Sequence, residues 1–551
     1  MAKSKKTPSV AEQLKSRLNP LSKGQAPHVI GKAGAGTGKT TTVIEGLKDM
    51  KGQPTKIDPS PEQRAIWDSI RLSKDARTIC LCAFNKSIAT ELQTRVPAGV
   101  DAMTMHSMGF KAVRNTFKLR PGRDAVAEND GRGKAIISEL LERDLRDLWS
   151  ECPVLLKATV ELVNLCKANL LEGTEEELAY IVCHFDVELA NGQSYRDEVF
   201  SLVPQVLARC KNVAKDGYVD FIDMIWLPVV LNLPLFRYDL LIVDEAQDLN
   251  RCQQELAKRA GKRLMFIGDE RQAIYGFTGA DCESMRRLER ELSESPLGCV
   301  ALPLTVTRRC GKAIVREANK VVSDFHAHES NPEGKVSEAL YPTKRGSSNY
   351  WTGGDDSPVE RPLAETYIPL VNDGDMVLCR VNAPLVSQCF KFIRLGRKAN
   401  IQGRDIGAGL VKLVNKMKAN SVEQLITHLT EWADKEVEKE QAKKNPSEAR
   451  VIAITDRLDC LMVFTDQAET VAEVVRKIET IFVDSKDVLG IRLSSIHKAK
   501  GLEADRVFLL MPEGGQVPHP MAKSQWQVEQ EWNLFYVAVT RAKHELIYVR
   551  Q

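Results

Sequence analysis

Residues 27–47 of the chain read PHVIGKAGAGTGKTTTVIEGL. An apolar run typical of a strand is followed by a glycine-rich turn and then by a stretch typical of a helix. This order predicts a phosphate-binding loop, because glycines let backbone N–H groups approach phosphate oxygens and the helix N-terminus adds a favourable dipole. Lys39 is then expected on the β- and γ-phosphates of a nucleotide, and Thr40 on its Mg²⁺.

One position of this loop departs from the strict pattern, which has glycine where this chain has Ala33. The neighbouring glycines are expected to compensate. The alternative is a glycine-rich turn without a ligand, but the loop follows a strand and opens a helix, as a phosphate loop does. The expected nucleotide contacts are Gly34, Gly36, Thr37, Gly38, Lys39, Thr40 and Thr41.

The order of strand and then helix recurs along the chain. TICLCAF (78–84), YDLLIVDEAQD (238–248) and KRLMFIGDERQ (262–272) each contain an apolar run that ends in polar residues, and a second series follows residue 300. This alternation predicts an α/β protein with parallel sheets flanked by helices. Ligands of such sheets bind at the carboxyl ends of the strands.

Two segments interrupt the alternation. Residues 111–237 have mostly helical patterns, as in GKAIISELLERDLRDLW (133–149), and residues 411–487 are helix-like, with a charge run at 431–444 that is typical of a solvated helix. Asp220 and Asp223, in DGYVDFIDMIWLP (216–228), are interpreted as structural residues and not as a metal site.

The composition is that of a globular protein of several domains. The chain has 551 residues, 43% hydrophobic and 27% charged, and a net charge of +3 that does not by itself require a polyanionic partner. No run approaches the roughly 18 apolar residues of a membrane span, so no membrane partner is expected. The 13 cysteines include no C-x-x-C pair, and we expect them to be reduced, with Cys80 and Cys82 on one face of a strand.

Asp244 and Glu245 are the expected partners of the phosphate loop. They follow an apolar run that delivers them to the edge of the sheet. Asp244 is expected to hold Mg²⁺ through water, and Glu245 to activate the attacking water as a general base. Together with the loop, this pair predicts ATP hydrolysis and not nucleotide binding alone.

Phosphoryl transfer commonly also requires an arginine, worth roughly 10³–10⁵ in rate. The candidates are Arg309 and Arg541, in the second half of the chain. Each taken alone is more typical of a surface arginine, so their assignment depends on a resemblance at the level of whole motifs.

Eight stretches, in order, resemble the successive motifs of the UvrD/Rep/PcrA-like superfamily 1 helicases. They are AGAGTGKTTT (33–42), AFNKSIA (83–89), TMHSMGF (104–110), IVDEAQD (242–248), GDERQAIYGFTGA (268–280), RRCGKAIVREAN (308–319), SSIHKAKGLE (494–503) and EWNLFYVAVTRAK (531–543). The second, third and last are particularly similar to the F-box DNA helicase branch, although no segment has the pattern of an F-box. The motifs extend over nearly the whole chain.

The resemblance implies an α/β fold of two RecA-like P-loop domains with helical insertion subdomains and with ATP bound between the two domains. Domain 1A is expected at residues 1–110 and 238–300, with helical insertion 1B at 111–237. Domain 2A is expected at 301–410 and 488–551, with a reduced helical insertion, 2B, at 411–487.

The resemblance also implies roles for individual residues. Gln272 matches the glutamine that senses the γ-phosphate. Arg309 and Arg541 match the arginines that reach this phosphate from the second domain, and Glu503 matches a residue that contacts the ribose. The implied catalytic set is therefore Lys39, Glu245, Gln272, Arg309 and Arg541, with Thr40 and Asp244 on the metal.

Single-stranded DNA is the track that the resemblance implies. Phe277 matches a ring that stacks on a base, a contact worth roughly 1–3 kcal/mol, and Tyr275 is interpreted equally well as a packing residue. Phe84 and His106 match further strand contacts, with a structural role as the alternative for Phe84. The remaining expected DNA contacts are Asn85, Lys86 and His497, of which the last is interpreted either as a DNA contact or as a residue that orders its loop.

Two positions depart from the family pattern. The aromatic residue that stacks on adenine is replaced by Arg308, whose guanidinium can also stack on a purine. The glutamine that reads adenine normally precedes the phosphate loop, where this chain has Gln13. The stretch PSPEQRAIWDSI (59–70) resembles that motif more closely, but it follows the loop and contains Gln63. Of the two we favour Gln13.

The sequence thus predicts an ATP- and Mg²⁺-dependent DNA helicase or translocase that moves 3′ to 5′ on single-stranded DNA and unwinds duplexes at junctions, in repair, recombination or replication. The main alternative is a DNA-stimulated ATPase that strips proteins from DNA, or acts in a recombination or defence complex, without processive unwinding. An RNA-directed motor and a small-molecule kinase are further alternatives, although the kinase leaves both arginines and the aromatic residues unexplained. We expect a cytoplasmic location, on the nucleoid in a bacterium or in the nucleus of a eukaryote.

Overall fold

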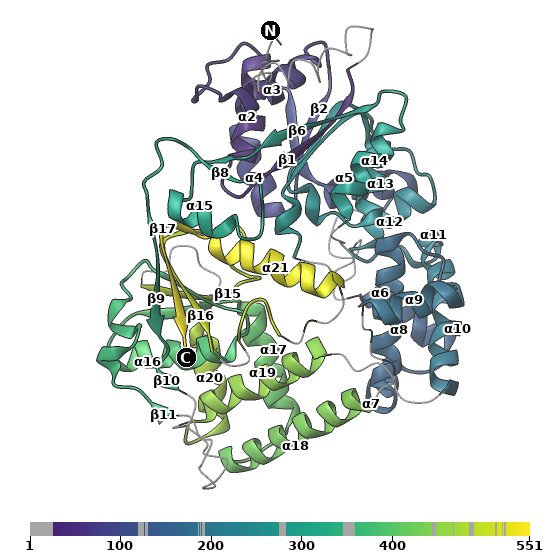
Figure 1. Ribbon diagram of the computed structural model, residues 1–551. Coiled ribbons are helices and arrows are strands. Elements are labelled where there is room, and N and C mark those ends of the chain that lie inside the picture. The colour runs from purple at the N-terminus through teal and green to yellow at the C-terminus, as the bar shows by residue number, and fades with distance from the viewer. Residues whose placement is uncertain are drawn as a thin grey trace, which may run out of the picture. The chain divides into compact units, whose positions relative to one another are not determined.

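The structure is a computed structural model that describes residues 26–119, 126, 130–185, 187, 189, 193–274, 283–344, 359–442, 448–466, 468–483, 490–512, 515–520, 522 and 525–551. The chain divides into two compact units, residues 1–305 and 306–551, and each unit contains a parallel sheet with helices (Figure 1). The predicted α/β class is therefore confirmed. Gln13, Tyr275 and Phe277 lie outside the described residues.

The first unit contains a six-stranded sheet in the order β3-β2-β4-β5-β1-β6. Every neighbouring pair of strands is parallel. The strands are β1 (His28–Ala33), β2 (Ile79–Ala83), β3 (Val100–Thr104), β4 (Tyr238–Val243), β5 (Gly261–Gly268) and β6 (Cys299–Leu304). Because parallel strands end at the same edge of a sheet, the segments that follow β1 to β5 meet at one edge.

The two faces of this sheet carry separate hydrophobic cores. Successive side chains of a strand point to opposite faces, so Ile30 joins one core while Val29 joins the other. Cys80 and Cys82 share the first core, with their Sγ atoms 4.0 Å apart, as predicted. The second core includes residues of α2 (Lys39–Met50), α3 (Pro61–Arg71) and α4 (Lys86–Arg95).

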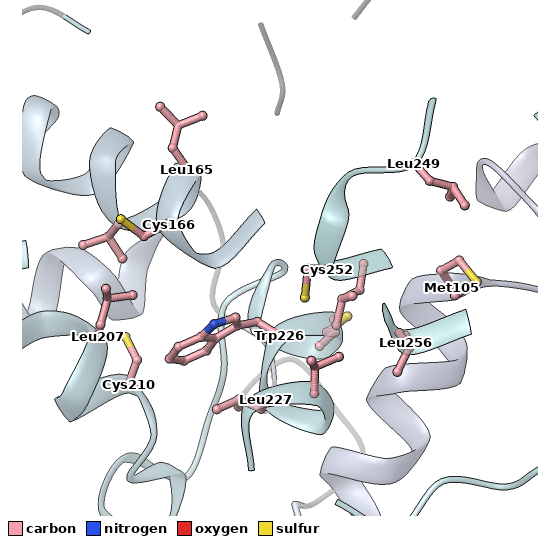
Figure 2. Close-up of a cluster of buried hydrophobic side chains, with 14 of the residues drawn as sticks. Met105, Leu165, Cys166, Leu207, Cys210, Trp226, Leu227, Leu249, Cys252 and Leu256 are labelled. Atoms are coloured by element: carbon pink, nitrogen blue, oxygen red, sulfur yellow. The ribbon is translucent and has the colours of Figure 1, made fainter. Parts of the chain in front are cut away.

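Helices of the expected insertion 1B share the first core with the sheet. The ring of Trp226, 2% exposed, lies among side chains of α8, α10 and α13 (Figure 2). Residues 111–237 therefore do not form a separate core. The remaining helices of the unit are α5 (Met105–Phe117), α6 (Gly131–Leu140), α7 (Leu145–Glu151), α8 (Pro153–Asn169), α9 (Glu175–Phe185), α10 (Gln193–Cys210), α11 (Val213–Asp216), α12 (Asp223–Val230), α13 (Arg251–Ala260) and α14 (Ser284–Ser293).

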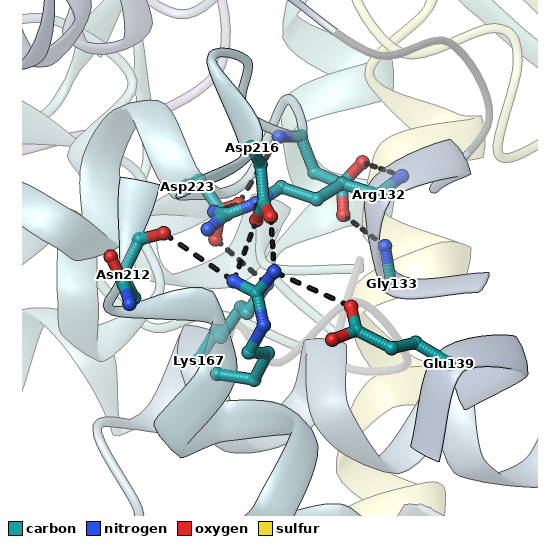
Figure 3. Close-up of polar contacts among 9 residues, drawn as sticks. Arg132, Gly133, Glu139, Lys167, Asn212, Asp216 and Asp223 are labelled. Carbon is teal, nitrogen blue, oxygen red and sulfur yellow. Dashed lines mark hydrogen bonds and ion pairs between the residues drawn. The ribbon is translucent and has the colours of Figure 1, made fainter. Parts of the chain in front are cut away.

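A buried ion cluster connects α6, α8, α11 and α12 (Figure 3). Arg132 donates to Asp216 and to Asp223, each at 2.8 Å, and Lys167 Nζ lies 2.7 Å from the other oxygen of Asp223. Asp220 accepts two backbone hydrogen bonds from the start of α6, each 2.9 Å long. These partners support the structural role expected for Asp220 and Asp223. Within the described ranges, no group of three or more metal-ligating side chains was found.

The second unit contains a seven-stranded parallel sheet in the order β14-β13-β15-β12-β16-β17-β9. Its strands are β9 (Lys335–Leu340), β12 (Met376–Cys379), β13 (Ala399–Gln402), β14 (Phe482–Val483), β15 (Ile491–Ser495), β16 (Ala504–Met511) and β17 (Ala542–Arg550). Two short pairs lie outside this sheet, β7 (Val306–Thr307) with β8 (His326–Ala327), and β10 (Thr343–Lys344) with β11 (Val359–Glu360).

Helices flank the second sheet and fill most of the segment expected to be insertion 2B. They are α15 (Lys312–Ala318), α16 (Ala383–Arg394), α17 (Arg404–Lys416), α18 (Val422–Gln441), α19 (Glu448–Thr465), α20 (Val471–Ile481) and α21 (Gln525–Val539). Most of the charge run at 431–444 lies on α18, so its helical interpretation is confirmed. No helix in the described part of the chain has the length and apolar character needed to cross a membrane.

Some of the expected domain limits differ from the structure. The first domain was expected to end at residue 300, but β6 (299–304) pairs in parallel with β1 and completes the first sheet, so the division falls after residue 305. Helix α5 (105–117) crosses the expected limit at 110, and α17 (404–416) crosses the one at 410.

Candidate nucleotide site and nucleic-acid surface

The phosphate loop connects β1 to α2 through two glycines in the left-handed backbone region. Gly36 has φ +68° and Gly38 has φ +80°, which residues with a Cβ rarely adopt. Thr37 donates from Oγ1 to the carbonyl oxygen of Gly34 at 3.0 Å and closes the loop. The first N–H groups of α2 have no intrahelical acceptor, so they are suited to bind phosphate oxygens.

Ala33, the departure from the phosphate-loop pattern, does not disturb the turn. It is the last residue of β1 and is buried in the second core of the first unit. The tight turn begins only at the next residue. The glycines that the turn needs are therefore all present.

The acids that follow β4 lie against the start of α2. Thr40 Oγ1 donates a short hydrogen bond to Oδ2 of Asp244, and Lys39 Nζ lies 3.6 Å from Oε1 of Glu245. Asp244 is only 5% exposed, and burial together with the charge of Glu245 raises its pKa. A cation held by Thr40 and Asp244 would offset this cost, and their oxygens are ligands that Mg²⁺ accepts. These residues therefore fit the metal that the sequence predicts.

Glu245 has a left-handed backbone, with φ 54° and ψ 42°, at a cost of about 1–3 kcal/mol for a residue with a side chain. Gln247, in the short helix Ala246–Asp248, fixes its carboxylate. Nε2 of Gln247 donates to Oε2 of Glu245 at 2.6 Å, and Oε1 accepts from the backbone N–H of Asp269 at 2.9 Å. Gln247 therefore joins Glu245 to the segment that follows β5.

Gln272 lies in the short helix Glu270–Gln272 after β5 and is 5% exposed. Its Nε2 donates to Oδ2 of Asp269 at 2.7 Å. Burial raises the pKa of Asp269, and the charge of Lys39 opposes this shift, because Lys39 lies near it. The structure thus brings Lys39, Glu245 and Gln272 to the carboxyl edge shared by β1, β4 and β5.

Gln63 lies on α3, which packs along α2. Its Nε2 donates to Oγ1 of Thr42 at 3.0 Å, and its Oε1 accepts from the N–H of Ser60 in a capping box. A Cβ on Gly38 would lie 3.7 Å from Nε2 of Gln63. Both ends of the Gln63 amide are therefore bonded beside the phosphate loop. The favoured Gln13 lies outside the described residues, so the adenine contact stays a prediction.

Three residues expected to contact DNA follow β2 at this same edge. Phe84 comes directly after the strand and is 44% exposed. Asn85 caps α4, because its Oδ1 accepts from the backbone N–H of Ile88 at 2.9 Å. Lys86 is the first residue of α4 and is exposed. Asn85 thus has a structural function independent of any ligand.

His106, on the first turn of α5 after β3, stacks on Phe221. The two ring centroids are 3.9 Å apart and the planes differ by 19°. Burial lowers the pKa of His106 to about 4, so the ring is neutral at physiological pH. Phe221 is 59% exposed. Phe221 therefore presents an exposed ring that covers the partly buried His106, and we call this pair the His106–Phe221 stack.

In the second unit, Arg309 and Glu503 form an ion pair, with Nε and Oε2 2.6 Å apart. Lys543 Nζ lies 2.9 Å from Oε1 of the same carboxylate. Burial would raise the pKa of Glu503, but the hydrogen bonds and charges of Lys543 and Arg309 outweigh it and lower the pKa. Arg308 is exposed beside Arg309.

Arg541 is 1% exposed and is held by its own unit. Its guanidinium donates to the carbonyl oxygens of Val537 and Leu502 at 2.9 Å and 3.0 Å, and to Oγ1 of Thr540 at 3.2 Å. These bonds fix the direction of the guanidinium from within its own unit. Arg309 is the more accessible of the two predicted arginines, with 19% of its side chain exposed.

His497 lies in the turn after β15. Burial, and secondarily the charge of Arg380, lowers its pKa to about 3. A neutral ring supplies no positive charge to a phosphate. This favours the interpretation in which His497 orders its loop.

The sequence patterns alone do not identify Gln247, Lys543 and Phe221 as residues of the site. Gln247 and Lys543 lie inside quoted motifs, IVDEAQD and EWNLFYVAVTRAK, so a polar residue near the predicted acids and arginines was the available signal. Phe221 lies between two acids in a stretch that we interpreted as structural. Its contact with His106 joins segments far apart in the chain, and no local pattern reveals such a contact.

Two family models match the chain. The UvrD/REP helicase N-terminal domain matches residues 15–293, and the UvrD-like helicase C-terminal domain matches residues 379–550. The first match alone covers half of the chain and contains the phosphate loop, Asp244, Glu245 and Gln272. The second contains Glu503 and Arg541.

Similar curated proteins include helicases of fungi and bacteria. F-box DNA helicase protein 1 of Schizosaccharomyces pombe is 22% identical over 94% of this chain, which spans only 55% of that protein. ATP-dependent DNA helicase PcrA of Bacillus subtilis is 24% identical over 98% of this chain and 83% of its own length. ATP-dependent DNA helicase UvrD2 of Mycobacterium tuberculosis is 25% identical over 93% of this chain and 75% of its own length. The chain therefore belongs to the UvrD/REP helicase family, and its fold is that of an ATP-hydrolysing motor with two RecA-like domains.

Proposed function

We propose that this protein is an ATP-dependent DNA helicase or translocase that moves 3′ to 5′ on single-stranded DNA and opens duplexes at single-strand–duplex junctions. One observation carries the proposal. At the carboxyl edge of the first sheet, β1, β4 and β5 are followed by the phosphate loop, Glu245 and Gln272, while the adjoining β2 and β3 are followed by Phe84 and the His106–Phe221 stack.

We assign ATP hydrolysis to the residues that follow β1, β4 and β5. In the proposed reaction, Lys39 and the N–H groups of the loop bind the β- and γ-phosphates. A water oxygen bonds to the γ-phosphorus as the bond to the β–γ bridging oxygen breaks, and Glu245 takes the proton of that water. Gln247 keeps the Glu245 carboxylate oriented through the 2.6 Å hydrogen bond.

The metal and the remaining nucleotide contacts complete this site. Thr40 and Asp244 would hold Mg²⁺, which supplies positive charge to the phosphates when bound. Arg309 and Arg541 of the second unit are proposed to act on the γ-phosphate, with Gln272 as its sensor. Glu503 is proposed to contact the ribose, and Arg308 to stack on the base.

We assign DNA binding to the residues that follow β2 and β3, together with Phe221. Aromatic side chains bind single strands with little sequence preference, because every base has a face on which to stack. Phe84 and Phe221 supply exposed rings, and Lys86 supplies charge. The backbone N–H of Asp244 donates to the carbonyl oxygen of Cys82 at 3.1 Å, so the strand that leads to Phe84 is bonded to the residue that precedes Glu245. This bond supports a link between nucleotide state and grip on DNA.

A second candidate is a DNA-stimulated translocase that does not unwind processively. It is favoured by the modest helical segment α17–α20, which is all that separates β13 from β14 in the described residues. The two candidates share the ATP site and differ in how the duplex is engaged.

A strand-displacement assay separates them. The substrates are duplexes with a 3′ tail, a 5′ tail or no tail, each labelled on the displaced strand. The proposed helicase displaces the strand only from the 3′-tailed duplex and only with hydrolysable ATP. If no duplex is opened while streptavidin is removed from the 5′ end of a biotinylated single strand, the translocase is the correct function.

A further inference from the structure

Glu503 connects three segments of the second unit. It directly precedes β16, Lys543 is the second residue of β17, and Arg309 lies between β7 and α15. Each of its carboxylate oxygens meets a different cation, Arg309 at 2.6 Å and Lys543 at 2.9 Å. The carboxylate is therefore held from two sides.

The pairing orients the guanidinium of Arg309 without occupying all of it. Oε2 of Glu503 lies 2.6 Å from Nε, which is inaccessible to solvent and has no aligned hydrogen bond, so the contact is an ion pair. Nη1 lies 3.5 Å from the carbonyl oxygen of Thr540, and Nη2 has no hydrogen-bond partner among the described residues. A guanidinium is a planar fork whose nitrogens can bind two oxygens of one phosphate. Held at Nε, Arg309 keeps its outer nitrogens directed away from Glu503 and suited to an anion.

Stability does not explain this cluster. The side chains of Glu503 and Lys543 are 40% and 34% exposed, and ion pairs at such exposure contribute little to folding. The backbone of this segment is fixed by other bonds, such as that from the N–H of Gly311 to the carbonyl oxygen of Lys543 at 2.7 Å. What Glu503 adds is the direction of the Arg309 side chain.

We propose that Glu503 is a positioning residue for Arg309, and that Lys543 holds Glu503 in place. This inference rests on the proposed function, in which Arg309 acts on the γ-phosphate and Glu503 contacts the ribose. A carboxylate has about four acceptor sites, so a ribose hydroxyl can bond to it beside the two cations. One carboxylate then contacts the sugar and aims the arginine, so the sugar affects the rate of hydrolysis as well as nucleotide affinity.

The test is steady-state ATP hydrolysis at saturating single-stranded DNA by the wild type, Glu503→Gln, Arg309→Ala and the double variant. Glutamine keeps the shape of the side chain and removes its charge. Glu545→Gln is the matched control, because Glu545 also bridges two cations of this unit, Lys335 and Arg506, each at 3.5 Å.

We expect Glu503→Gln to lower kcat by about 10²-fold, the typical effect of a misplaced catalytic group, and Glu545→Gln to leave kcat unchanged. The double variant should be no slower than Arg309→Ala, because Glu503 acts through that arginine. Lys543→Gln should lower kcat less than Glu503→Gln does. It should have no further effect on kcat when it is combined with Glu503→Gln. With 2′- and 3′-deoxy-ATP, the wild type should lose kcat on at least one nucleotide, and Glu503→Gln should not discriminate in kcat.

The inference is overturned if Glu503→Gln raises KM for ATP at unchanged kcat, since Glu503 is then only a nucleotide contact. It is also overturned if the effects of Glu503→Gln and Arg309→Ala on kcat multiply in the double variant. Both results leave the proposed ATPase intact. A folded wild-type protein that hydrolyses no ATP contradicts the proposed function and this inference together.

Discussion

Glu245, the proposed general base, has a backbone conformation that is unfavourable for a residue with a side chain. Its left-handed φ of 54° is unusual for glutamate, and such conformations cluster at functional sites, where the surrounding structure maintains them. Here Gln247 maintains the side chain with a 2.6 Å bond and is itself bonded to the segment after β5. Gln247 thus orients the carboxylate that we propose as the general base.

Replacing Gln247 tests this arrangement. We expect Gln247→Ala to lower kcat for ATP hydrolysis by about 10²-fold, because the carboxylate loses its orientation, with little change in nucleotide affinity. Glu245→Gln should lower kcat by roughly 10²–10⁴-fold. The measurement is DNA-stimulated hydrolysis together with binding of a fluorescent ATP analogue. Gln205→Ala, on the exposed side of α10, is the control. A loss of binding equal to the loss of rate would show that Gln247 only supports the fold.

The His106–Phe221 stack is the second test at the scale of residues. Phe221→Ala should weaken single-stranded DNA binding by about 1–3 kcal/mol and spare hydrolysis without DNA. Phe236→Ala is a matched control, because Phe236 is 61% exposed in the same unit but precedes β4, at the opposite edge of the sheet. Fluorescence anisotropy with a labelled oligonucleotide gives both affinities. Equal losses in the two variants would contradict a specific contact at Phe221.

At the scale of elements, the helices of 1B contain a cluster of buried charged side chains that contributes to their stability. Arg132 and Lys167 each pair with Asp223, and all three side chains are 0% exposed. A buried charge that loses its partner is strongly destabilising. This cluster ties α6 and α8 to α12, which packs on the sheet domain through Trp226. The packing of α6 and α8 against α12 therefore involves these three side chains.

Lys167→Met should lower the free energy of unfolding by about 3–5 kcal/mol, since it leaves Asp223 with one of its two cations. Lys157→Met, on the exposed side of the same helix α8, should change it by no more than about 0.5 kcal/mol. Urea denaturation followed by circular dichroism measures both. Similar stabilities of the two variants would mean that the ion cluster is dispensable.

Strands β1 and β5 are joined by a buried histidine that makes their pairing sensitive to pH. Nδ1 of His28 accepts from the N–H of Leu264 at 3.0 Å, and burial, with the charge of Arg263, lowers the pKa of His28 from 6.5 to about 4. The unfolded chain therefore takes up this proton at a higher pH than the folded protein does. The contribution of neutral His28 to stability is complete above pH 6.5 and is lost as the pH falls toward 4.

His28→Asn tests this linkage, because the asparagine oxygen can accept the Leu264 bond without titrating. Between pH 7 and pH 5, the free energy of unfolding should fall more in the wild type than in this variant. The measurement is urea denaturation at both pH values. Identical decreases would show that His28 is not a source of the pH dependence.

At the scale of the whole molecule, most of the element order was predictable from the sequence, and the placement of elements was less so. The phosphate loop and the strands before Asp244 and Asp269 have strong local patterns, and the structure has them where they were expected. The position of β6 was not predictable, because only pairing with β1, at the other end of the unit, assigns it to the first sheet.

Part of the candidate site was likewise predictable from the sequence, and part of it was not. Lys39, Asp244 and Glu245 are recognisable from residue type and spacing, because the chemistry of phosphates restricts which residues can serve there. The Glu503–Arg309–Lys543 bridge and the His106–Phe221 stack join segments far apart in the chain. Their residues were individually visible, but the contacts that give them a role depend on tertiary structure.

ATP hydrolysis by the purified protein, with and without single-stranded DNA and beside Lys39→Ala, tests the central claim most directly. Lys39 is expected on the phosphates, and its replacement should abolish hydrolysis while the protein stays folded and still binds DNA. We expect hydrolysis that DNA stimulates strongly in the wild type and that is absent from Lys39→Ala under both conditions. Hydrolysis at the same rate with and without DNA would contradict a motor whose ATP site and DNA surface lie on one edge of the first sheet.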